Sequence, residues 1–305
     1  MAEVAKLWPA YRAWFLWQGV LARPTYLASE RALRTHMPEL LPLYNELVEL
    51  GGGGDLFARF MTSWCPPAYA TGCSQGVWLH GEPLLVRTYD YDAALWDGLV
   101  LRTEWLGRTV VGTSDSLWGL LDGINDAGLS ASLAFGGRRV VGPGFGIPLV
   151  IRYLLQVCTT TEEAVAVLRR VPCHMTYTVT VVDIHGHSAT VFLAPDRLAQ
   201  VTSNLAATNH QFAVEWPEHA LSTGSVERLA EVANAATDPT LGHKGFIARF
   251  LGQNVWSNDY EDGAGTLYAA CYAPHARSLT LLWPNEHWTF PMDDFQPGSR
   301  TVTLD

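Results

Sequence analysis

The sequence predicts a layered α+β fold. Two features of the 305-residue chain support this: strand patterns come in runs, and a block of two helical patterns separates one run from the next. A third is the apolar content of 48%, which is enough to fill a large core. Strands that alternated one by one with helices would instead indicate a parallel βαβ sheet. We therefore expect sheets and helices in separate layers.

The first part of the chain is predicted to be helical. Between residues 31 and 50, apolar side chains recur every three or four positions, which is the spacing of an amphipathic helix. The glycines at 51–54 end this pattern. A second short helical pattern over 56–64 then runs into two prolines, and strand patterns follow.

Strands are predicted in the next part. Residues 76–92 and 99–115 each predict two strands joined by a short turn that contains glycine. Residues 123–137 predict a turn followed by a strand rich in small residues. These segments form the first run of strands.

Two helices are predicted after this run, over 148–158 and 160–172. Thr160 and Glu163 have the S/T-x-x-E spacing of a capping box, and Pro172 stops the second helix. This block separates the two runs of strands.

The rest of the chain predicts further strands and one helix. Alternating apolar residues indicate hairpins over 176–195 and 266–284, and a strand ends within 205–212. A helical pattern over 226–236 lies between them.

Charge and composition exclude several partners. The formal net charge is −10 and the pI is near 5.4, whereas nucleic acids and anionic lipids are bound by clustered positive charge. No apolar run has membrane-spanning length, and the first residues lack an uninterrupted signal-peptide core. We therefore expect no nucleic-acid or membrane partner and a cytoplasmic location.

The sequence indicates no cofactor and no metal. It contains neither a phosphate-binding loop nor a dinucleotide fingerprint. Its five cysteines are an odd number without C-x-x-C spacing, so they predict neither a disulfide framework nor a zinc site.

One cysteine stands out by its surroundings. The stretch ATGCSQG at 70–76 places Cys73 among small residues, where a substrate carbonyl can approach the thiol. Cleavage of the Gly72–Cys73 bond would give Cys73 a free α-amine with a pKa of about 8, which can act as a general base. The competing interpretation is a small buried hydrophobic residue at the start of a strand.

Charged and polar groups that could assist this thiol follow in the sequence. Arg87 and Asp90 are three residues apart; the arginine would favour the thiolate, and the carboxylate could hold an α-amine. A simple ion pair at a strand end is the alternative. Asn125 and Asn209 could each donate to an oxyanion, although an asparagine in a turn often serves the local backbone.

The order of these segments resembles a known family. GCS, RTYDYD, GINDAGLS, VVDIHGH, TNHQF and STGSVERL follow one another as in the Cys-type N-terminal nucleophile (Ntn) hydrolases. Within that superfamily the chain resembles the acyl-coenzyme A:6-aminopenicillanic acid acyltransferase family, the C45 peptidase group, which is related to the choloylglycine hydrolases. The resemblance implies a four-layer αββα sandwich of the Ntn hydrolase type.

The resemblance also implies self-activation. A helical prosegment over 1–72 and a catalytic domain over 73–305 would become two subunits of the zymogen after autoproteolysis between Gly72 and Cys73. The catalytic residues of the family map onto Cys73 as nucleophile, Arg87, Asp90, Asn125, Asn209 and, in STGSVERL, Arg228.

The implied activity is hydrolysis of a linear amide, or acyl transfer, through a Cys73 thioester. The expected partners are a small-molecule amide or acyl substrate and the chain's own cleaved N-terminal segment; homo-oligomerisation is left open. Two alternatives are a papain-like enzyme with a Cys73/His210 dyad and no autocleavage, and a non-catalytic binding protein of the same fold.

Overall fold

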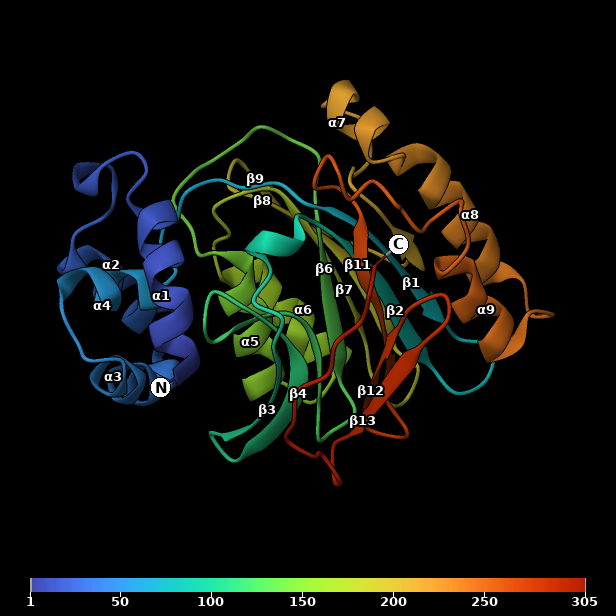
Figure 1. Cartoon of the computed structure of the whole chain (residues 1–305), viewed down its shortest axis with the longest axis horizontal. Coiled ribbons are helices and arrows are strands. Elements are labelled where there is room, and N and C mark those ends of the chain that lie inside the picture. The colour runs from blue at the N-terminus through green and yellow to red at the C-terminus, as the bar shows by residue number, and fades with distance from the viewer. Residues whose placement is uncertain (1, 305) are drawn as a thin grey trace.

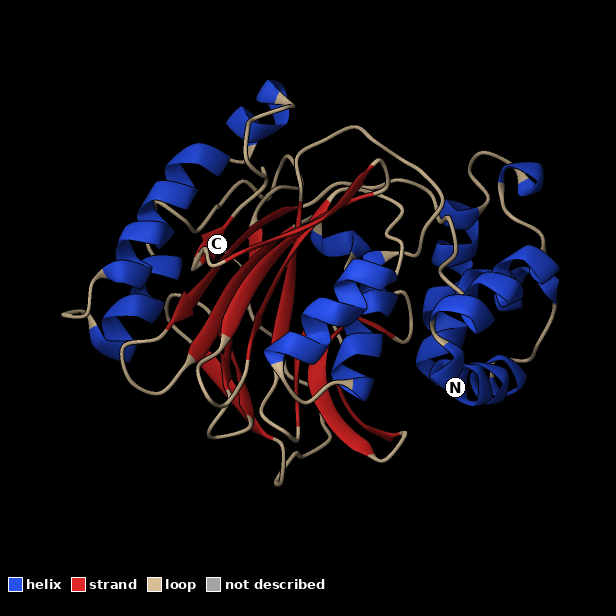
Figure 2. Cartoon of the chain, turned by 180° about the vertical axis from the view of Figure 1, so that it is seen from behind, coloured by secondary structure: helices blue, strands red, loops and turns tan. Residues whose placement is uncertain are grey.

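The computed structural model describes residues 2–304 and confirms the layered α+β fold. Two antiparallel sheets lie face to face, and helices cover their outer faces. Figures 1 and 2 show this αββα sandwich from opposite sides, with a separate group of N-terminal helices beside it. No helix in this part of the chain has the length and apolarity to cross a membrane.

The N-terminal helices hold one correction to the sequence prediction. The prediction of one continuous helix over 31–50 is wrong. Helix α2 ends at His36, and a 3-10 turn that starts at Pro38 follows. Proline has no N–H to donate within a helix. The elements of this group are α1 (Ala2–Phe15), η1 (Val20–Ala22), α2 (Tyr26–His36), η2 (Pro38–Leu40), α3 (Leu41–Leu50) and α4 (Asp55–Met61).

The first sheet has the strand order β10-β1-β2-β11-β12-β13. The predicted hairpins over 76–92 and 266–284 are both found in it, and the chain segments that form its centre are far apart in sequence. Its strands are β1 (Gly72–Trp78), β2 (Leu84–Asp90), β10 (Ala206–Ala207), β11 (Thr266–Ala273), β12 (Ser278–Leu282) and β13 (His287–Pro291).

The second sheet follows the chain order from β3 to β9. Its strands are β3 (Val100–Trp105), β4 (Arg108–Asp115), β5 (Gly119–Asn125), β6 (Ser130–Phe135), β7 (Tyr177–Val182), β8 (Ser188–Ala194) and β9 (Arg197–Thr202). The short η3 (Ala93–Leu95) precedes β3. Strand β5 was not predicted, since its sequence GLLDGIN lacks the alternation of apolar and polar residues that marks a half-buried strand.

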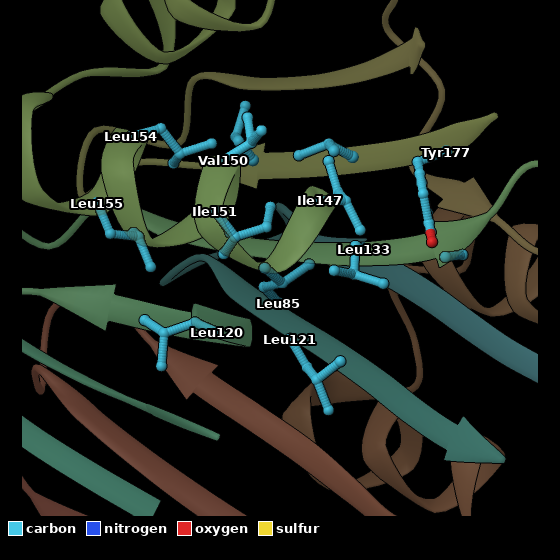
Figure 3. Packing of buried hydrophobic residues seen from close by; sticks show 14 of the residues in the cluster. Leu85, Leu120, Leu121, Leu133, Ile147, Val150, Ile151, Leu154, Leu155 and Tyr177 are labelled. Atoms are coloured by element: carbon cyan, nitrogen blue, oxygen red, sulfur yellow. The ribbon is translucent and has the colours of Figure 1, made fainter. Parts of the chain in front are cut away.

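Helices α5 (Ile147–Val157) and α6 (Thr161–Arg170) cover the second sheet. The predicted capping box is present: the Thr160 side chain accepts from the Glu163 N–H, and the Glu163 carboxylate accepts from the Thr160 N–H. Figure 3 shows the side chains of α5 packing onto leucines of the sheet. Ile147, Ile151 and Leu154 are fully buried there, so α5 is fixed by hydrophobic contact.

Helices α8 (Ser225–Thr237) and α9 (Gly242–Phe250) cover the first sheet, and the short α7 (Pro217–Ser222) precedes them. Their approach depends on Gly76 of β1. A Cβ atom at Gly76 would lie 2.7 Å from Val232 Cγ1, 2.9 Å from Phe250 Cζ and 3.2 Å from Phe246 Cζ. The absence of a side chain on β1 therefore lets both helices rest against the strand.

We expect Gly76→Ala to lower the free energy of unfolding by about 1–3 kcal/mol, because the added methyl group overpacks this contact. Urea denaturation measures the change. Gly298→Ala is the matched control, since a Cβ atom there meets nothing within 4 Å. Equal stability of the two variants would contradict this account of how the helices dock.

Candidate active site

Cys73 faces the space between the two sheets. In the pairing of β1 with β2, Cys73 lies opposite Tyr89 and Gln75 lies opposite Arg87. Alternate residues of a strand share a face, so Cys73 and Arg87 point to the same side. The Arg87 Nη2 atom lies 3.1 Å from Cys73 Sγ, and both side chains are fully buried.

Burial controls the ionisation of this thiol. It raises the pKa of Cys73, the positive charge of Arg87 lowers it, and the negative charge of Asp90 raises it again. The net direction of the pKa is upward. The Thr71 hydroxyl, 3.7 Å from Sγ, is a second polar contact. In the continuous chain the thiol is therefore mainly protonated and closed to solvent.

Arg87 is held by the opposite sheet. Its Nε atom donates to the Leu133 carbonyl at 2.9 Å, and its Nη1 atom donates to Asp122 Oδ2 at 2.5 Å. Asp122, on β5, also accepts from the Thr113 hydroxyl at 2.7 Å and from the Tyr272 hydroxyl. Sequence reasoning missed Asp122; its position two residues before the IND turn was the only available signal.

Asn209 holds the backbone on both sides of Gly72. Its Oδ1 atom accepts the Cys73 N–H at 2.9 Å. Its Nδ2 atom lies 3.2 Å from each of the Thr71 and Phe135 carbonyl oxygens and donates to both. The amide nitrogen of the Gly72–Cys73 bond is thus fixed by a side chain from a distant part of the sequence.

Asp90 and Arg228 lie beside Gly72. Arg228 donates to Asp90 Oδ2, and the Thr266 hydroxyl donates to Asp90 Oδ1 at 2.6 Å. A Cβ atom at position 72 would lie 3.0 Å from the Asp90 Cβ and Oδ2 atoms. A side chain at position 72 would therefore press against the Asp90 carboxylate, and glycine avoids this contact.

The family described as acyl-coenzyme A:6-aminopenicillanic acid acyl-transferase matches residues 78–288, which is more than half of the chain. The chain belongs to this family. The matched segment begins after Cys73 and includes Arg87, Asp90, Asp122 and Asn209. As a member of an acyltransferase family the chain is an enzyme, which argues against the alternative of a non-catalytic binding protein.

Solved structures show the same fold. The acyltransferase-family chain is similar to a conjugated bile acid hydrolase from Clostridium perfringens, with 13% identity, a TM-score of 0.54, and coverage of 77% of this chain and 99% of that one. It is also similar to penicillin V acylase from Agrobacterium tumefaciens, with 18% identity, a TM-score of 0.50, and coverage of 72% and 86%.

A third similar structure is the Caenorhabditis elegans ortholog of N-acylethanolamine-hydrolyzing acid amidase. Here the identity is 16%, the TM-score is 0.50, and 73% of this chain and 100% of that one are covered. These likenesses confirm the Ntn-hydrolase fold of the acyltransferase-family chain. No functionally curated protein sequence matches it.

The side chain of Asn125, which the sequence suggested as an oxyanion donor, binds the backbone instead. The Asn125 side chain donates to the carbonyls of Leu155 and Cys158 at 2.9 and 2.8 Å, and its oxygen accepts from the Ala127 and Leu129 N–H groups. These bonds tie the end of α5 to the turn after β5. Because both amide hydrogens are already bound, Asn125 has a structural role here and does not serve as an oxyanion donor.

His210 is also used elsewhere. Its Nδ1 atom lies 2.8 Å from the Ser225 hydroxyl, and burial lowers the pKa of its imidazole. The polar contacts of Cys73 Sγ are with Arg87 and Thr71 instead. The geometry therefore gives no support to the papain-like Cys73/His210 dyad.

We expect Asp122→Asn to lower the free energy of unfolding by about 3–5 kcal/mol, because it leaves the guanidinium of Arg87 buried without a countercharge. Urea denaturation tests this. Asp293→Asn removes one partner of the exposed Arg277–Asp293 pair and should change stability by less than about 1 kcal/mol. A similar small effect at Asp122 would show that the Arg87–Asp122 pair does not hold the sheets together.

Proposed function

We propose that the chain is the precursor of a cysteine-dependent amide hydrolase or acyltransferase, which activates itself by cleavage between Gly72 and Cys73. The observation that carries the proposal is the pair of contacts at this bond. Asn209 holds the nitrogen of the bond at 2.9 Å, and Arg87 lies 3.1 Å from the thiol sulfur that would attack its carbonyl. Residues 1–72 and 73–305 would be the two subunits.

The cleavage needs water and no other reactant. Cys73 Sγ attacks the Gly72 carbonyl carbon, the bond from that carbon to the Cys73 nitrogen breaks, and the thiol proton passes to the departing nitrogen. This gives a thioester between Gly72 and Cys73 Sγ. Water then hydrolyses the thioester, which leaves a carboxylate on Gly72 and returns the thiol. Cys73 gains a free α-amine.

Cleavage changes what Asn209 can do. In the continuous chain its Nδ2 atom donates to Thr71, which belongs to the segment before the cut. Once that segment is a separate chain and can shift, the same N–H becomes free to donate to the oxyanion of a substrate. Asp90, held by Arg228, lies opposite Gly72 in the pairing of β1 with β2 and would accept from the new α-amine. The site of self-cleavage and the site of turnover would then be one.

In turnover the α-amine would take the thiol proton while Sγ attacks the substrate amide, and it would pass this proton to the leaving amine. Arg87 favours the thiolate by its charge. The acyl group, held as a thioester, is released to water or to a second acceptor. The family description, which names acyl transfer, and the similar structures, which are an acylase and hydrolases by name, support this class of reaction.

The cleaved N-terminal segment would stay bound. The Trp118 indole donates to the Met61 carbonyl at 3.0 Å, and the Tyr153 hydroxyl donates to Glu39 at 2.7 Å. The rings of Trp64 and Phe145 also meet edge to face, with centroids 4.8 Å apart. These contacts join the segment to the second sheet and α5 independently of the Gly72–Cys73 bond.

We expect denaturing mass spectrometry of the purified protein to show two fragments, residues 1–72 and a second that begins with Cys73. Cys73→Ala should give one continuous chain, because no other group can start the acyl shift. Cys271→Ala, which removes a buried thiol on the nearby strand β11, is the matched control and should still be cut. A wild-type chain that hydrolyses amides while it stays continuous would overturn the proposal.

We further expect Asn209→Ala to slow the appearance of the fragments roughly 10²-fold, since small displacements of reacting groups cost that much. The time course of cleavage after expression in a cell-free system measures this. Asn125→Ala is the control: it removes an equally buried asparagine that binds only α5 and its turn. It should lower thermal stability and leave cleavage of the folded chain near the wild-type rate; the reverse pattern would exchange the two roles.

A further inference from the structure

A cavity of about 150 Å³ lies between α1 and the segment that follows β2. A volume of this size is enough for one small organic group. Six of the thirteen residues that line it are aromatic: Tyr11, Trp14, Tyr69, Tyr89, Tyr91 and Trp96. The electron-rich faces of such rings attract cations.

Two carboxylates, Asp97 and Asp115, lie in the same wall. In the part of the chain that the structure describes, no lysine, arginine or histidine lines the cavity. The Oδ2 atom of Asp97 is buried and has no hydrogen-bond partner within residues 2–304. The cavity therefore combines aromatic faces with two carboxylates, and none of the described basic side chains lines it.

The hydroxyl of Tyr11 lies between the two carboxylates. Its oxygen lies 2.6 Å from Asp97 Oδ1 and 2.8 Å from Asp115 Oδ1, and it accepts the Ser116 N–H at 2.8 Å. A phenol has one hydrogen, so the two carboxylates share a single donor. Two negative charges around one phenol repel each other, which favours the uptake of a proton by one of them.

The surroundings of the two carboxylates also favour the uptake of a proton. Burial raises the pKa of Asp97 to about 7 and also raises that of Asp115. Burial also raises the pKa values of the phenols that face the pair, Tyr69, Tyr89 and Tyr91, so these stay neutral. The positive charge of Arg87 acts in the opposite direction on the pKa of Asp115; its guanidinium lies over the ring of Tyr89, 4.7 Å from its centre.

The cavity adjoins the nucleophile. Tyr89 lines it and is the direct cross-strand neighbour of Cys73. Tyr69 lines it as well and belongs to the segment just before Thr71, whose hydroxyl contacts Sγ. A substrate with its amide at Cys73 would reach the cavity past Tyr89, along the segment that cleavage releases.

We propose that the cavity binds an ammonium group of the substrate, so that the enzyme acts on amides whose acyl or amine part carries a positive charge. The link to Cys73 rests on the proposed function; the binding of the cation does not. Aromatic faces and a buried negative charge together favour a cation, whereas a neutral group of the same shape gains only the apolar contact. An anionic group is repelled.

The proposal has a defined pH dependence. A bound cation favours the form in which both carboxylates are ionised, so a proton on either of them competes with the cation. Affinity should therefore rise as the pH increases through about 7, where Asp97 loses its proton in the empty protein. A site that relied on aromatic contacts alone would bind equally well on both sides of this pH.

The test uses full-length Cys73→Ala protein, which needs neither cleavage nor turnover. Choline and 3,3-dimethylbutan-1-ol, which have the same shape but differ in charge, are titrated by calorimetry at about pH 6 and about pH 8. We expect choline to bind at least about tenfold more tightly than the alcohol, and more tightly at the higher pH. Equal affinities for the two probes, or no saturable choline binding, would overturn the proposal.

Variants locate the site. Asp97→Asn and Asp115→Asn should each weaken choline binding about tenfold, and Trp96→Leu should do so without changing the charge. Asp293→Asn, which makes the same change of charge on an exposed residue, should have no effect. Thermal melts confirm that each variant is folded, and Trp96→Leu decides the question if both aspartate variants unfold. Choline binding that none of the three folded variants weakens would place the site elsewhere.

The choline-binding test and the cleavage test can each fail without the other. A chain that cuts itself but does not bind choline would retain the proposed reaction and lose the substrate class. A chain that binds choline but is never cut would retain the cavity and lose the mechanism.

Discussion

The ion pair between Arg87 and Asp122 is the interaction on which the site depends. It joins the two sheets at their buried interface, with Arg87 on β2 and Asp122 on β5. A charged pair without solvent is stable only when its hydrogen bonds are complete, and both partners meet that condition through backbone and hydroxyl contacts. The same guanidinium contacts Cys73 Sγ, so the ion pair that links the two sheets also affects the pKa of the thiol.

In the proposed mechanism, this arrangement would keep the uncut chain inactive for a physical reason. Burial outweighs the attraction of Arg87 and raises the pKa of Cys73, and Asn209 is occupied by the backbone around Gly72. Breaking one peptide bond would change all of this, because it would add an amine beside the sulfur, free one amide hydrogen of Asn209 and loosen the segment that covers the thiol. A precursor activated in this proposed way would need no separate inhibitory domain.

The sequence alone was sufficient to predict most strands. It was also sufficient to predict those site residues that lie near one another along the chain or across one hairpin. Arg87 and Asp90 are close to Cys73 because β1 and β2 form a tight antiparallel pair, which alternation and turn residues predict. Asp122 reaches the site from the facing sheet, and single-sequence patterns carry no information on how two sheets align. Asn125 failed as a predicted donor because a turn asparagine satisfies local backbone before it can serve a substrate.

The N-terminal helices would remain part of the enzyme after the proposed cleavage, because they contribute to its cavity. Tyr11 and Trp14 of α1 line the cavity beside Tyr89, and the hydroxyl of Tyr11 is the donor that two half-buried carboxylates, Asp97 and Asp115, share. These residues lie well before the segment that matches the acyltransferase family, whereas Arg87 and Asn209 lie within it. The groups around the thiol thus belong to the family fold, and one wall of the neighbouring cavity comes from a helix outside the matched segment. Selection among substrates could therefore diverge through α1 while Cys73, Arg87 and Asn209 remain as they are.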